Sequence, residues 1–431
     1  MWTYGDQAQG TGTFPGRNFK ARSGRRNVVR FDNFIHTPIA GDIHLHGAHT
    51  APLFDGFPDD GLPFGGHKYY VYDNDADDFP ATLWYHDHSL DFTGRNVYMG
   101  LAGFYPLQDA VEDALQLPGS VNDSSTDFDV PLVVQDRIFD ANNQLFYNSF
   151  SHDGLIGDTF LVNGVPQPFF TVSRRKYRFR LLNGSNARIY QLTLNGSSGT
   201  LPFNAIATEG GLFKAAVQTD SLLVGMAERF EFIIDFSKLP KTQTTLTLNN
   251  IMQQTNGRGP DGPDSRHPTP LLQFRIVDDG AVDNSQFPAT LRTDQPVFNP
   301  AEAVAHRTFE FNRSQGAWQV NGRFFDPNRD DATIKQNTTE IWTLKNGGGG
   351  WWHPIHIHLI RLRMLSRNGR PPVGVEAAGQ KDTFLLQGGD EVQVITKFVG
   401  SPTEHVGRYV FHCHNVEHED MRMMAVMNIV K

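Results

Sequence analysis

Short segments in which apolar and polar residues alternate recur along the whole chain, separated by turns rich in glycine and proline. Successive side chains on a β-strand point to opposite faces, so a period of two predicts strands with one buried face. A short helix is predicted only at Ala110–Leu117. The pattern therefore predicts an all-β protein built from sandwiches or barrels. The predicted strands include Asn27–Phe34, Tyr177–Leu182, Arg229–Phe236, Glu391–Phe398 and Arg408–Cys413.

A repeated motif divides the chain into three parts. Trp2-Thr-Tyr-Gly, Leu161-Val-Asn-Gly and Gln319-Val-Asn-Gly are each followed, after a loop, by a strand that leads to an asparagine. These asparagines lie 150 and 163 positions apart, which predicts one β-sandwich module used three times. We expect the modules at residues 1–115, 125–285 and 300–431, with polar or proline-rich joints at about 107–129 and 277–306. The closing asparagines are Asn33, Asn183 and Asn346.

Charge and composition argue against several classes of partner. The net charge is −9 and the chain has no run of lysine and arginine, so neither nucleic acid nor an anionic membrane is expected as a partner. No apolar stretch of about 18 residues occurs, so no membrane span is expected. The first residues lack a basic and an apolar region, so no signal peptide is predicted there. The single cysteine, Cys413, excludes a disulfide within one chain.

Four histidine motifs stand out against this ordinary composition. Residues two apart on a strand share a face, so each His-x-His pair can present two imidazoles to one metal ion. One such pair is weak support for a site, but four pairs at matched ends of a repeated sandwich predict metal binding. The motifs are His44-Leu-His46, Trp84-Tyr-His86-Asp-His88, His353-Pro-Ile-His356-Ile-His358 and His412-Cys413-His414. We interpret the other seven histidines as surface or hydrogen-bonded residues: His36, His49, His67, His152, His267, His306 and His405.

The fourth motif indicates a particular metal. Alternation places Cys413 on one face of its strand and both flanking histidines on the other, so the thiolate and its neighbours serve different sites. A thiolate, two imidazoles and a weak methionine ligand are typical of a blue copper centre. His418 and His353 are the candidate imidazoles, and Met423 is the candidate axial ligand, with Met421 as its alternative. Zinc is the rival metal, but it gains little from a thioether.

The four motifs, in this order, resemble the copper signatures of the multicopper oxidases. Trp84–His88, Val133–Arg137 and Arg174–Arg180 resemble the branch of bacterial spore-coat laccases, bilirubin oxidases and phenoxazinone synthases. The resemblance covers nearly the whole chain and implies three cupredoxin-like Greek-key β-sandwich domains. It also implies a laccase-type enzyme with four copper ions that oxidises phenols, aminophenols or bilirubin-like pigments by single electrons and reduces dioxygen to water.

The resemblance implies a role for each motif residue. A trinuclear cluster is expected between the first and last modules, and the middle module is expected to be a spacer without ligands. The expected type 1 copper ligands are His353, Cys413, His418 and Met423. The expected type 2 ligands are His44 and His356. The expected type 3 ligands are His46, His86, His88, His358, His412 and His414.

Reduction of dioxygen also needs protons. By the same resemblance, Asp55 and Glu419 are candidate proton relays to the cluster, and the alternative is that both are solvated surface acids. Electrons are expected to enter at exposed imidazole edges of His418 or His353. Trp351 and Trp352 directly precede His353 and form either an aromatic wall of this entrance or part of the core.

Some expectations concern the chain as a whole. The resemblance implies additional β structure before the first repeat, so we expect the first sandwich to lack one or two strands and the turn at Gln7–Gly16 to be long. We expect a monomer that is secreted, periplasmic or on the spore or cell surface, with dioxygen and a small aromatic reductant as partners. Two alternatives remain open: a blue copper carrier without dioxygen chemistry, and a sandwich protein that uses metal only for stability.

Overall fold

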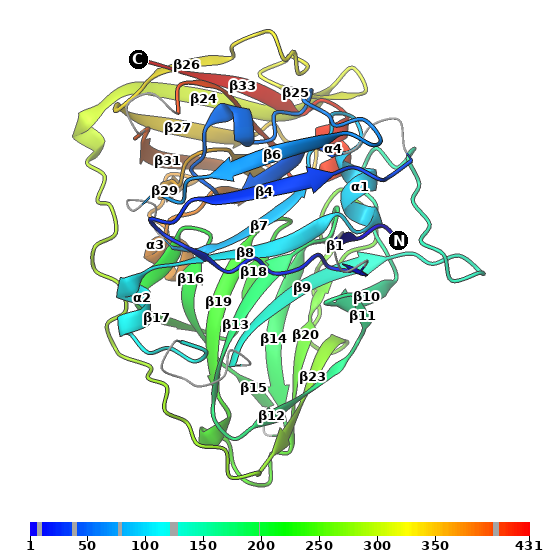
Figure 1. Cartoon of the computed structure of the whole chain (residues 1–431), viewed down its shortest axis with the longest axis vertical. Helices are drawn as coiled ribbons and strands as arrows, with labels where there is room; N and C mark the ends of the chain where they lie inside the picture. The colour runs from blue at the N-terminus through cyan, green and yellow to red at the C-terminus, as the bar shows by residue number, and fades with distance from the viewer. Residues whose placement is uncertain (7–10, 37–40, 76–79, 121–127, 198, 400–404) are drawn as a thin grey trace.

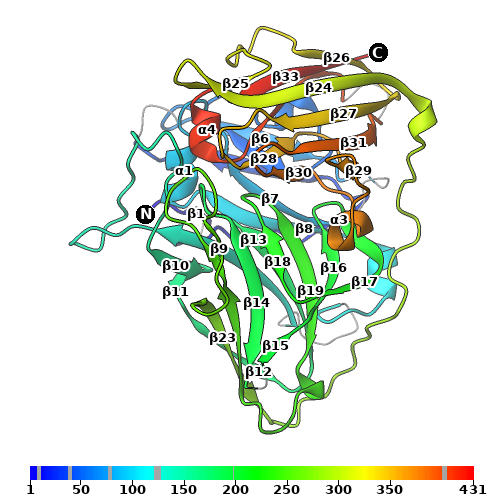
Figure 2. The same cartoon turned by 180° about the vertical axis from the view of Figure 1, so that it is seen from behind.

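The structure is a computed structural model that describes residues 1–6, 11–36, 41–75, 80–120, 128–197, 199–399 and 405–431. The chain is mainly β and forms three sets of sheets, which confirms the predicted fold class. Strands of the middle set, drawn in green, lie below the first set in blue and cyan and the last set in yellow to red (Figures 1 and 2). The first and last modules therefore lie against each other above the middle one.

The first module has the smallest sheets among the described residues. A four-stranded sheet has the order β3-β8-β7-β5, and two further pairs are β4-β6 and β1-β2. Residues 7–10, within the turn predicted to be long, lie outside the described residues. Its strands are β1 (Tyr4–Asp6), β2 (Thr11–Thr13), β3 (Ala21–Arg22), β4 (Asn27–Asp32), β5 (Ile43–His46), β6 (His67–Tyr72), β7 (Thr82–Asp87) and β8 (Ala102–Gln108). Its helices are η1 (Pro52–Phe54), α1 (Thr93–Met99) and α2 (Ala110–Ala114).

The middle module is a sandwich of two sheets. A seven-stranded sheet has the order β11-β10-β9-β13-β19-β16-β17, and a six-stranded sheet contains β12-β23-β20-β14-β15 with β18 beside β14. Its first elements are β9 (Asp129–Arg137), β10 (Thr159–Val162), β11 (Val165–Pro166), β12 (Phe169–Ser173), β13 (Lys176–Asn183), β14 (Tyr190–Gly196), β15 (Gly199–Leu201) and β16 (Phe203–Thr208). They are followed by β17 (Gly211–Thr219), β18 (Leu222–Val224), β19 (Arg229–Asp235), η3 (Phe236–Lys238), β20 (Thr245–Asn250), β21 (Met252–Gln253), β22 (Gly262–Pro263) and β23 (Thr269–Val277).

The last module is a sandwich of two five-stranded sheets, with the orders β25-β24-β27-β31-β29 and β26-β33-β32-β28-β30. Its first elements are η4 (Pro300–Glu302), β24 (Ala303–Ser314), β25 (Ala317–Val320), β26 (Ala332–Lys335), β27 (Thr339–Asn346), β28 (His353–Ile357) and β29 (Arg363–Arg367). The rest are α3 (Gly374–Ala378), β30 (Thr383–Leu386), β31 (Glu391–Lys397), β32 (Gly407–Cys413), α4 (Val416–Asp420) and β33 (Met424–Val430).

The alternating pattern located the strands well. The five predicted segments correspond to β4, β13, β19, β31 and β32, and the predicted helix corresponds to α2. No helix in the described ranges is longer than α1, which has 7 residues. The predicted joints fall between β8 and β9 and between β23 and β24, although residues 121–127 of the first joint lie outside the described residues. The limits of the three modules themselves stay predictions.

The repeated Val-Asn-Gly motif has a local physical cause. Asn163 and Asn321 both have φ of 50°, and the glycine after each also has a positive φ. Two consecutive residues of this kind form the tight turn that matches the twist of an antiparallel hairpin. Each asparagine side chain also accepts a backbone N–H from a neighbouring strand, from Val133 and from Glu310 respectively. The repeat therefore marks the same turn in the middle and last modules.

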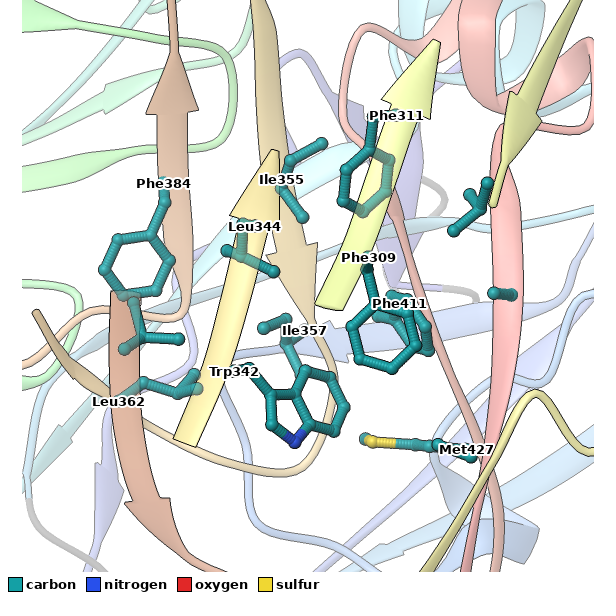
Figure 3. Close-up of a cluster of buried hydrophobic side chains, with 14 of the residues drawn as sticks. Phe309, Phe311, Trp342, Leu344, Ile355, Ile357, Leu362, Phe384, Phe411 and Met427 are labelled. Atoms are coloured by element: carbon teal, nitrogen blue, oxygen red, sulfur yellow. The ribbon is translucent and has the colours of Figure 1, made fainter. Parts of the chain in front are cut away.

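The core of the last module holds the strands that carry most of the candidate ligands. Phe309 on β24 and Trp342 on β27 project from one sheet, and Phe411 on β32 projects from the other (Figure 3). The ring centroids of Phe309 lie 4.5 Å from Phe411 and 4.7 Å from Trp342. Such aromatic packing adds to the hydrophobic burial of both sheets. It holds β32, and with it Cys413, against the opposite sheet.

Buried ion pairs join the first module to the middle one. Arg180 on β13 donates to Asp129, to Glu231 and to the hydroxyl of Thr82 on β7. Arg178, on the same strand, pairs with Glu112 of α2 and with Glu231. A buried charge is tolerated only when it is paired, so these contacts make the orientation of the two modules specific.

No helix in the described part of the chain is long and apolar enough to cross a membrane.

The packing in Figure 3 makes a testable prediction. We expect Phe309→Ala to lower the unfolding free energy of the last module by about 3–5 kcal/mol, because it leaves a cavity between two sheets. Denaturant titration followed by tryptophan fluorescence measures this loss. Phe150→Ala is the matched control, because Phe150 is 83% exposed and its truncation is expected to change stability by less than about 0.5 kcal/mol. Equal losses in both variants would contradict the assigned core.

Candidate metal centres

Strand pairing brings the four histidine motifs together. On the first module, β5 runs antiparallel to β7 and places His44 opposite His86. On the last module, β28 runs antiparallel to β32 and places His356 opposite His412. The second histidine of each pair follows two residues later on the same face. Adjacent strands in each module thus present four imidazoles to one another.

The interface between the first and last modules brings these two sets into one buried cluster. Nε2 of His44 lies 3.3 Å from Nε2 of His356, and Nε2 of His88 lies 3.2 Å from Nε2 of His412. His46 stacks on His356 with ring centroids 3.5 Å apart. The side chains are completely or almost completely buried. The cluster consists of His44, His46, His86, His88, His356, His358, His412 and His414.

The hydrogen-bond partners of three imidazoles show which ring nitrogen carries no proton and is therefore bare. Nδ1 of His44 donates to the Asp55 carbonyl (2.6 Å), and Nδ1 of His356 donates to the Asp382 carbonyl (3.0 Å). Nδ1 of His358 donates to a carboxylate oxygen of Asp55 (2.7 Å). Oxygen acceptors require the proton on Nδ1, so Nε2 of each ring carries a lone pair. Two such lone pairs facing each other at 3.3 Å repel unless a cation lies between them.

Other atoms of the cluster have no partner at all. Nε2 of His86, Nδ1 of His88, Nδ1 of His46 and both nitrogens of His414 are buried without a hydrogen bond. Nearly all buried polar groups in proteins are hydrogen-bonded, so a cluster of such partnerless nitrogens is typical of atoms that bind a metal ion. Burial also lowers the pKa of His88 to about 4, so this ring is neutral at pH 7, as a metal ligand must be. The donor set therefore fits metal ions that prefer imidazole.

A second site lies on the other face of β32. Sγ of Cys413 lies 3.4 Å from Nδ1 of His353 and 3.6 Å from Nδ1 of His418. The predicted division of faces is confirmed, because His412 points to the histidine cluster instead. Burial raises the pKa of the Cys413 thiol and lowers the pKa of His353 to about 3. A thiolate here therefore requires a bound cation to compensate its charge.

Met423 lies beside this sulfur site. Its carbonyl accepts the backbone N–H of Cys413 (3.0 Å), and its own N–H donates to the carbonyl of His418 (3.0 Å). The side chain is fully buried in the core of the last module, whereas Met421 is only partly buried. These contacts favour Met423 over Met421 as a neighbour of the cysteine.

The two candidate proton relays are buried, so the reading of them as surface acids is wrong. Asp55 and Glu419 are each 1% exposed. Burial raises the pKa of Asp55 well above its usual value. An oxygen of Glu419 lies 3.1 Å from Nδ1 of His412, and although burial opposes it, His412 and His88 lower the pKa of Glu419. The first and last modules thus each supply one buried carboxylate in contact with the imidazole cluster.

Two residues at these sites, Asp382 and Trp318, were not identified from the sequence. Asp382 is fully buried and lies 3.1 Å from Nε2 of His46. Although burial opposes it, Arg229 lowers the pKa of Asp382 well below its usual value. Trp318 packs against His418 with ring centroids 3.8 Å apart and the two ring planes tilted by 32°. Neither belongs to a histidine motif, and the only available signal was their position in the last module.

The expected exposed entrance to the sulfur site is absent from the described structure. His418 and His353 are 0% and 1% exposed, so the expectation of accessible imidazole edges was wrong. Nε2 of His418 donates to the Asp153 carbonyl (3.2 Å), which covers it from the middle module. Trp351 belongs to the core of the last module, and Trp352 packs beside a smaller cluster.

A cavity of about 850 Å³ lies next to this covered site. Its wall includes His152, whose carbonyl accepts a hydrogen bond from Nε1 of Trp318 (3.0 Å). The same tryptophan contacts His418, so Trp318 links the His152 part of the cavity wall to the sulfur site. The aromatic and sulfur-containing lining residues are Trp2, Phe92, Met99, Tyr147, Phe324 and Met421.

Comparisons with known proteins agree with this geometry. Residues 7–111 and 297–431 match family models described as multicopper oxidase. The chain is 37% identical over 427 residues to a bilirubin oxidase from Albifimbria verrucaria, covering 97% of this chain and 72% of the relative. It is 31% identical over 491 residues to a laccase from Bacillus stratosphericus, covering 100% and 91%. A solved multicopper oxidase from Aquifex aeolicus matches with a TM-score of 0.82 at 27% identity, covering 96% and 89%.

The sulfur site makes a prediction that needs only a spectrum and a metal analysis. We expect Cys413→Ser to lose the intense blue colour of the copper-loaded protein, because that colour comes from the bond between Cu(II) and thiolate. Copper at the histidine cluster is expected to stay, since Cys413 points away from it. Visible absorption and copper content per chain measure both effects. Retained blue colour would mean that Cys413 is not the thiolate ligand.

Proposed function

The chain belongs to the multicopper oxidase family, and we propose that its buried histidine cluster and its cysteine site hold the coppers of this enzyme class. It is a copper oxidoreductase that oxidises a reducing substrate in one-electron steps and reduces dioxygen to water. The family uses four coppers, one of type 1, one of type 2 and two of type 3. The observation that carries the residue assignment is the set of bare imidazole nitrogens that face one another across the interface of the first and last modules.

In this proposal the type 1 copper is held by one thiolate and two imidazoles. His353 and His418 direct Nδ1 toward Sγ of Cys413 at distances close to those that one shared ion requires. Met423 is the proposed axial ligand, because its backbone is hydrogen-bonded to both Cys413 and His418. A thioether on copper is a weak ligand that tunes the reduction potential.

The histidine cluster divides naturally into three subsets. His44 and His356, whose bare Nε2 atoms face each other, are the proposed type 2 ligands. One type 3 copper is proposed to take His88, His358 and His412, whose ring nitrogens form one compact group. The other is proposed to take the three remaining histidines of the cluster, which carry partnerless nitrogens: His46, His86 and His414.

When bound, the coppers supply one-electron transfer and a Lewis-acidic site for dioxygen. The chain itself supplies the connection between the sites, since the peptide bonds around Cys413 lead directly to His412 and His414 on the other face. It also excludes bulk water, because both sites are buried. We propose that Asp55 and Glu419 pass protons to the cluster. Asp55 accepts the N–H of His358 at Oδ2 and can hold a proton at its other oxygen, whereas Glu419 is an ionised carboxylate beside Nδ1 of His412 that can take up a proton and pass it on.

The substrate is proposed to be a small aromatic reductant that binds in the cavity beside Trp318. The cavity wall contains aromatic rings among charged side chains, and Trp318 connects this wall at His152 to His418 through one ring contact and one hydrogen bond. Phenols, aminophenols and bilirubin-like pigments fit such a lining, since aromatic walls favour flat, easily oxidised rings. The bilirubin oxidase and laccase relatives support this choice of substrate class.

We further propose that the enzyme acts as a monomer outside the cytoplasm, either secreted, periplasmic or at the spore or cell surface. The resemblance to spore-coat laccases supports the location. The composition of the two proposed metal sites supports the monomer, because all of their residues belong to one chain.

The decisive test follows dioxygen consumption by the copper-loaded protein with a methoxyphenol donor, together with the visible spectrum of the same sample. We expect blue colour and dioxygen uptake together, and neither in the copper-free protein. Blue colour without uptake would contradict the trinuclear cluster and favour a blue copper carrier. Bound metal with neither property would favour a purely structural metal site.

The buried carboxylates make a separate prediction. We expect Asp55→Asn and Glu419→Gln each to slow dioxygen reduction by about 10²-fold or more, because an amide cannot deliver a proton. The blue colour is expected to stay, since neither carboxylate contacts Cys413. Stopped-flow reoxidation of the fully reduced enzyme measures this step. Asp59→Asn is the control, because Asp59 is exposed, and normal reoxidation in both buried variants would refute the relay.

A further inference from the structure

We infer that Arg229 of the middle module is a positioning residue for the trinuclear cluster and that it acts through Asp382. The inference rests on the proposed function, because it takes the buried histidines as copper ligands. It changes the role of the middle module, which the sequence analysis treated as a spacer between two sets of ligands.

The first observation is a fully buried, bidentate ion pair between the middle and last modules. Nη1 and Nη2 of Arg229 donate to the two carboxylate oxygens of Asp382 at 2.8 Å and 2.6 Å, and both side chains are 0% exposed. Nε of Arg229 also donates to the Thr82 carbonyl of β7 (3.0 Å). The guanidinium fork is therefore held by residues of all three modules and has one available orientation.

The second observation is that the same carboxylate contacts two imidazoles from different modules. Oδ1 of Asp382 lies 3.1 Å from Nε2 of His46 and 3.6 Å from Nδ1 of His356. The hydroxyl of Thr383 donates to the same oxygen (2.8 Å). A carboxylate that accepts an imidazole N–H selects the tautomer and the orientation of the ring, and it makes the other nitrogen a better metal ligand. In His46 that other nitrogen, Nδ1, has no partner.

The third observation explains the glycine that follows the first histidine pair. Gly47 has φ of +85°, and a Cβ atom there would lie 2.5 Å from Nη2 of Arg229 and 2.8 Å from Oδ2 of Asp382. Any side chain at this position would therefore collide with the ion pair as well as strain the backbone. Gly47 directly follows His46, so the chain leaves space for the pair at the point where it meets the cluster.

Further ion pairs, in which the last module carries the positive charge, lie at the same contact between the middle and last modules. Lys381, next to Asp382, pairs with Glu209 and Glu228 of the middle module at 2.8 Å and 3.0 Å. Glu209 also accepts the backbone N–H of Arg229 (3.0 Å). Lys381 and Asp382, which are neighbours in the last module, thus each pair with side chains of opposite charge in the middle module. This arrangement specifies how the two modules meet, so a shift of the middle module would separate Arg229 from Asp382.

The experiment compares Arg229→Gln, Asp382→Asn and the double variant in the full-length protein. Copper content per chain, blue absorption and the chelator concentration that removes copper are measured on each. We expect each single variant to bind copper at the histidine cluster about 10–100-fold more weakly, with the blue colour retained. If Arg229 acts through Asp382, the double variant loses no more than the weaker-binding single variant. Arg229→Lys, which keeps the charge but not the fork, is expected to lie between wild type and Arg229→Gln.

A matched control separates positioning from general destabilisation. Arg180→Gln removes another buried arginine that bridges the middle and first modules but contacts none of the histidines. We expect it to keep copper at the cluster. In the copper-free protein, ¹⁵N NMR of the imidazoles gives an independent readout: wild type is expected to hold His46 protonated at Nε2, and Arg229→Gln to show a mixture of tautomers.

The outcomes also separate this inference from the proposed function. Wild type with four coppers and an Arg229→Gln variant that holds them equally tightly, or an Arg180→Gln variant that loses them equally, would overturn the inference and leave the function standing. Additive losses in the double variant would show that Arg229 does not act through Asp382. Wild type that binds no copper at the histidine cluster would overturn the proposed function and the inference together.

Discussion

The structure depends on one electrostatic constraint: imidazole nitrogens with bare lone pairs face each other across a buried interface. His44 and His356 come from different modules, yet their Nε2 atoms approach to 3.3 Å with no proton available to bridge them. Such an interface is unfavourable without a cation, because burial removes the water that would otherwise solvate the lone pairs. In the proposed function, metal binding at these nitrogens stabilises the contact between the first and last modules. Folding and cofactor binding are coupled at this point.

The carboxylates around the cluster follow from the same constraint. Asp55 and Asp382 accept N–H groups from the imidazoles and so determine which nitrogens remain bare. Each carboxylate must itself be compensated, since an isolated buried charge is costly. For Asp382 the compensation comes from Arg229 of the middle module. Through Arg229, the middle module thereby contacts a carboxylate that lies beside His46 of the first module and His356 of the last.

Electron entry is constrained differently. The imidazoles beside Cys413 are covered by Trp318 and by the Asp153 carbonyl, so neither ring is exposed at the surface. The neighbouring cavity of about 850 Å³ has aromatic rings in its wall, and the carbonyl of His152 in that wall accepts a hydrogen bond from Trp318. A covered site keeps water from the thiolate, while a short aromatic contact still permits electron transfer from a bound ring. In the proposed function, the two faces of β32 separate substrate oxidation from dioxygen chemistry.

The sequence by itself determined the strands, the all-β class and the histidine motifs, because alternation along a strand is a local property that directly reports which face is buried. It also separated Cys413 from His412 by face, for the same reason. Only the tertiary structure decided that Asp55 and Glu419 are buried, that His418 is covered, and that Asp382 joins the cluster. These facts depend on residues far apart in the chain, such as Arg229 and Asp382, whose contact leaves no local pattern. Burial and charge pairing arise where modules meet, and the meeting of modules is a property of the whole fold.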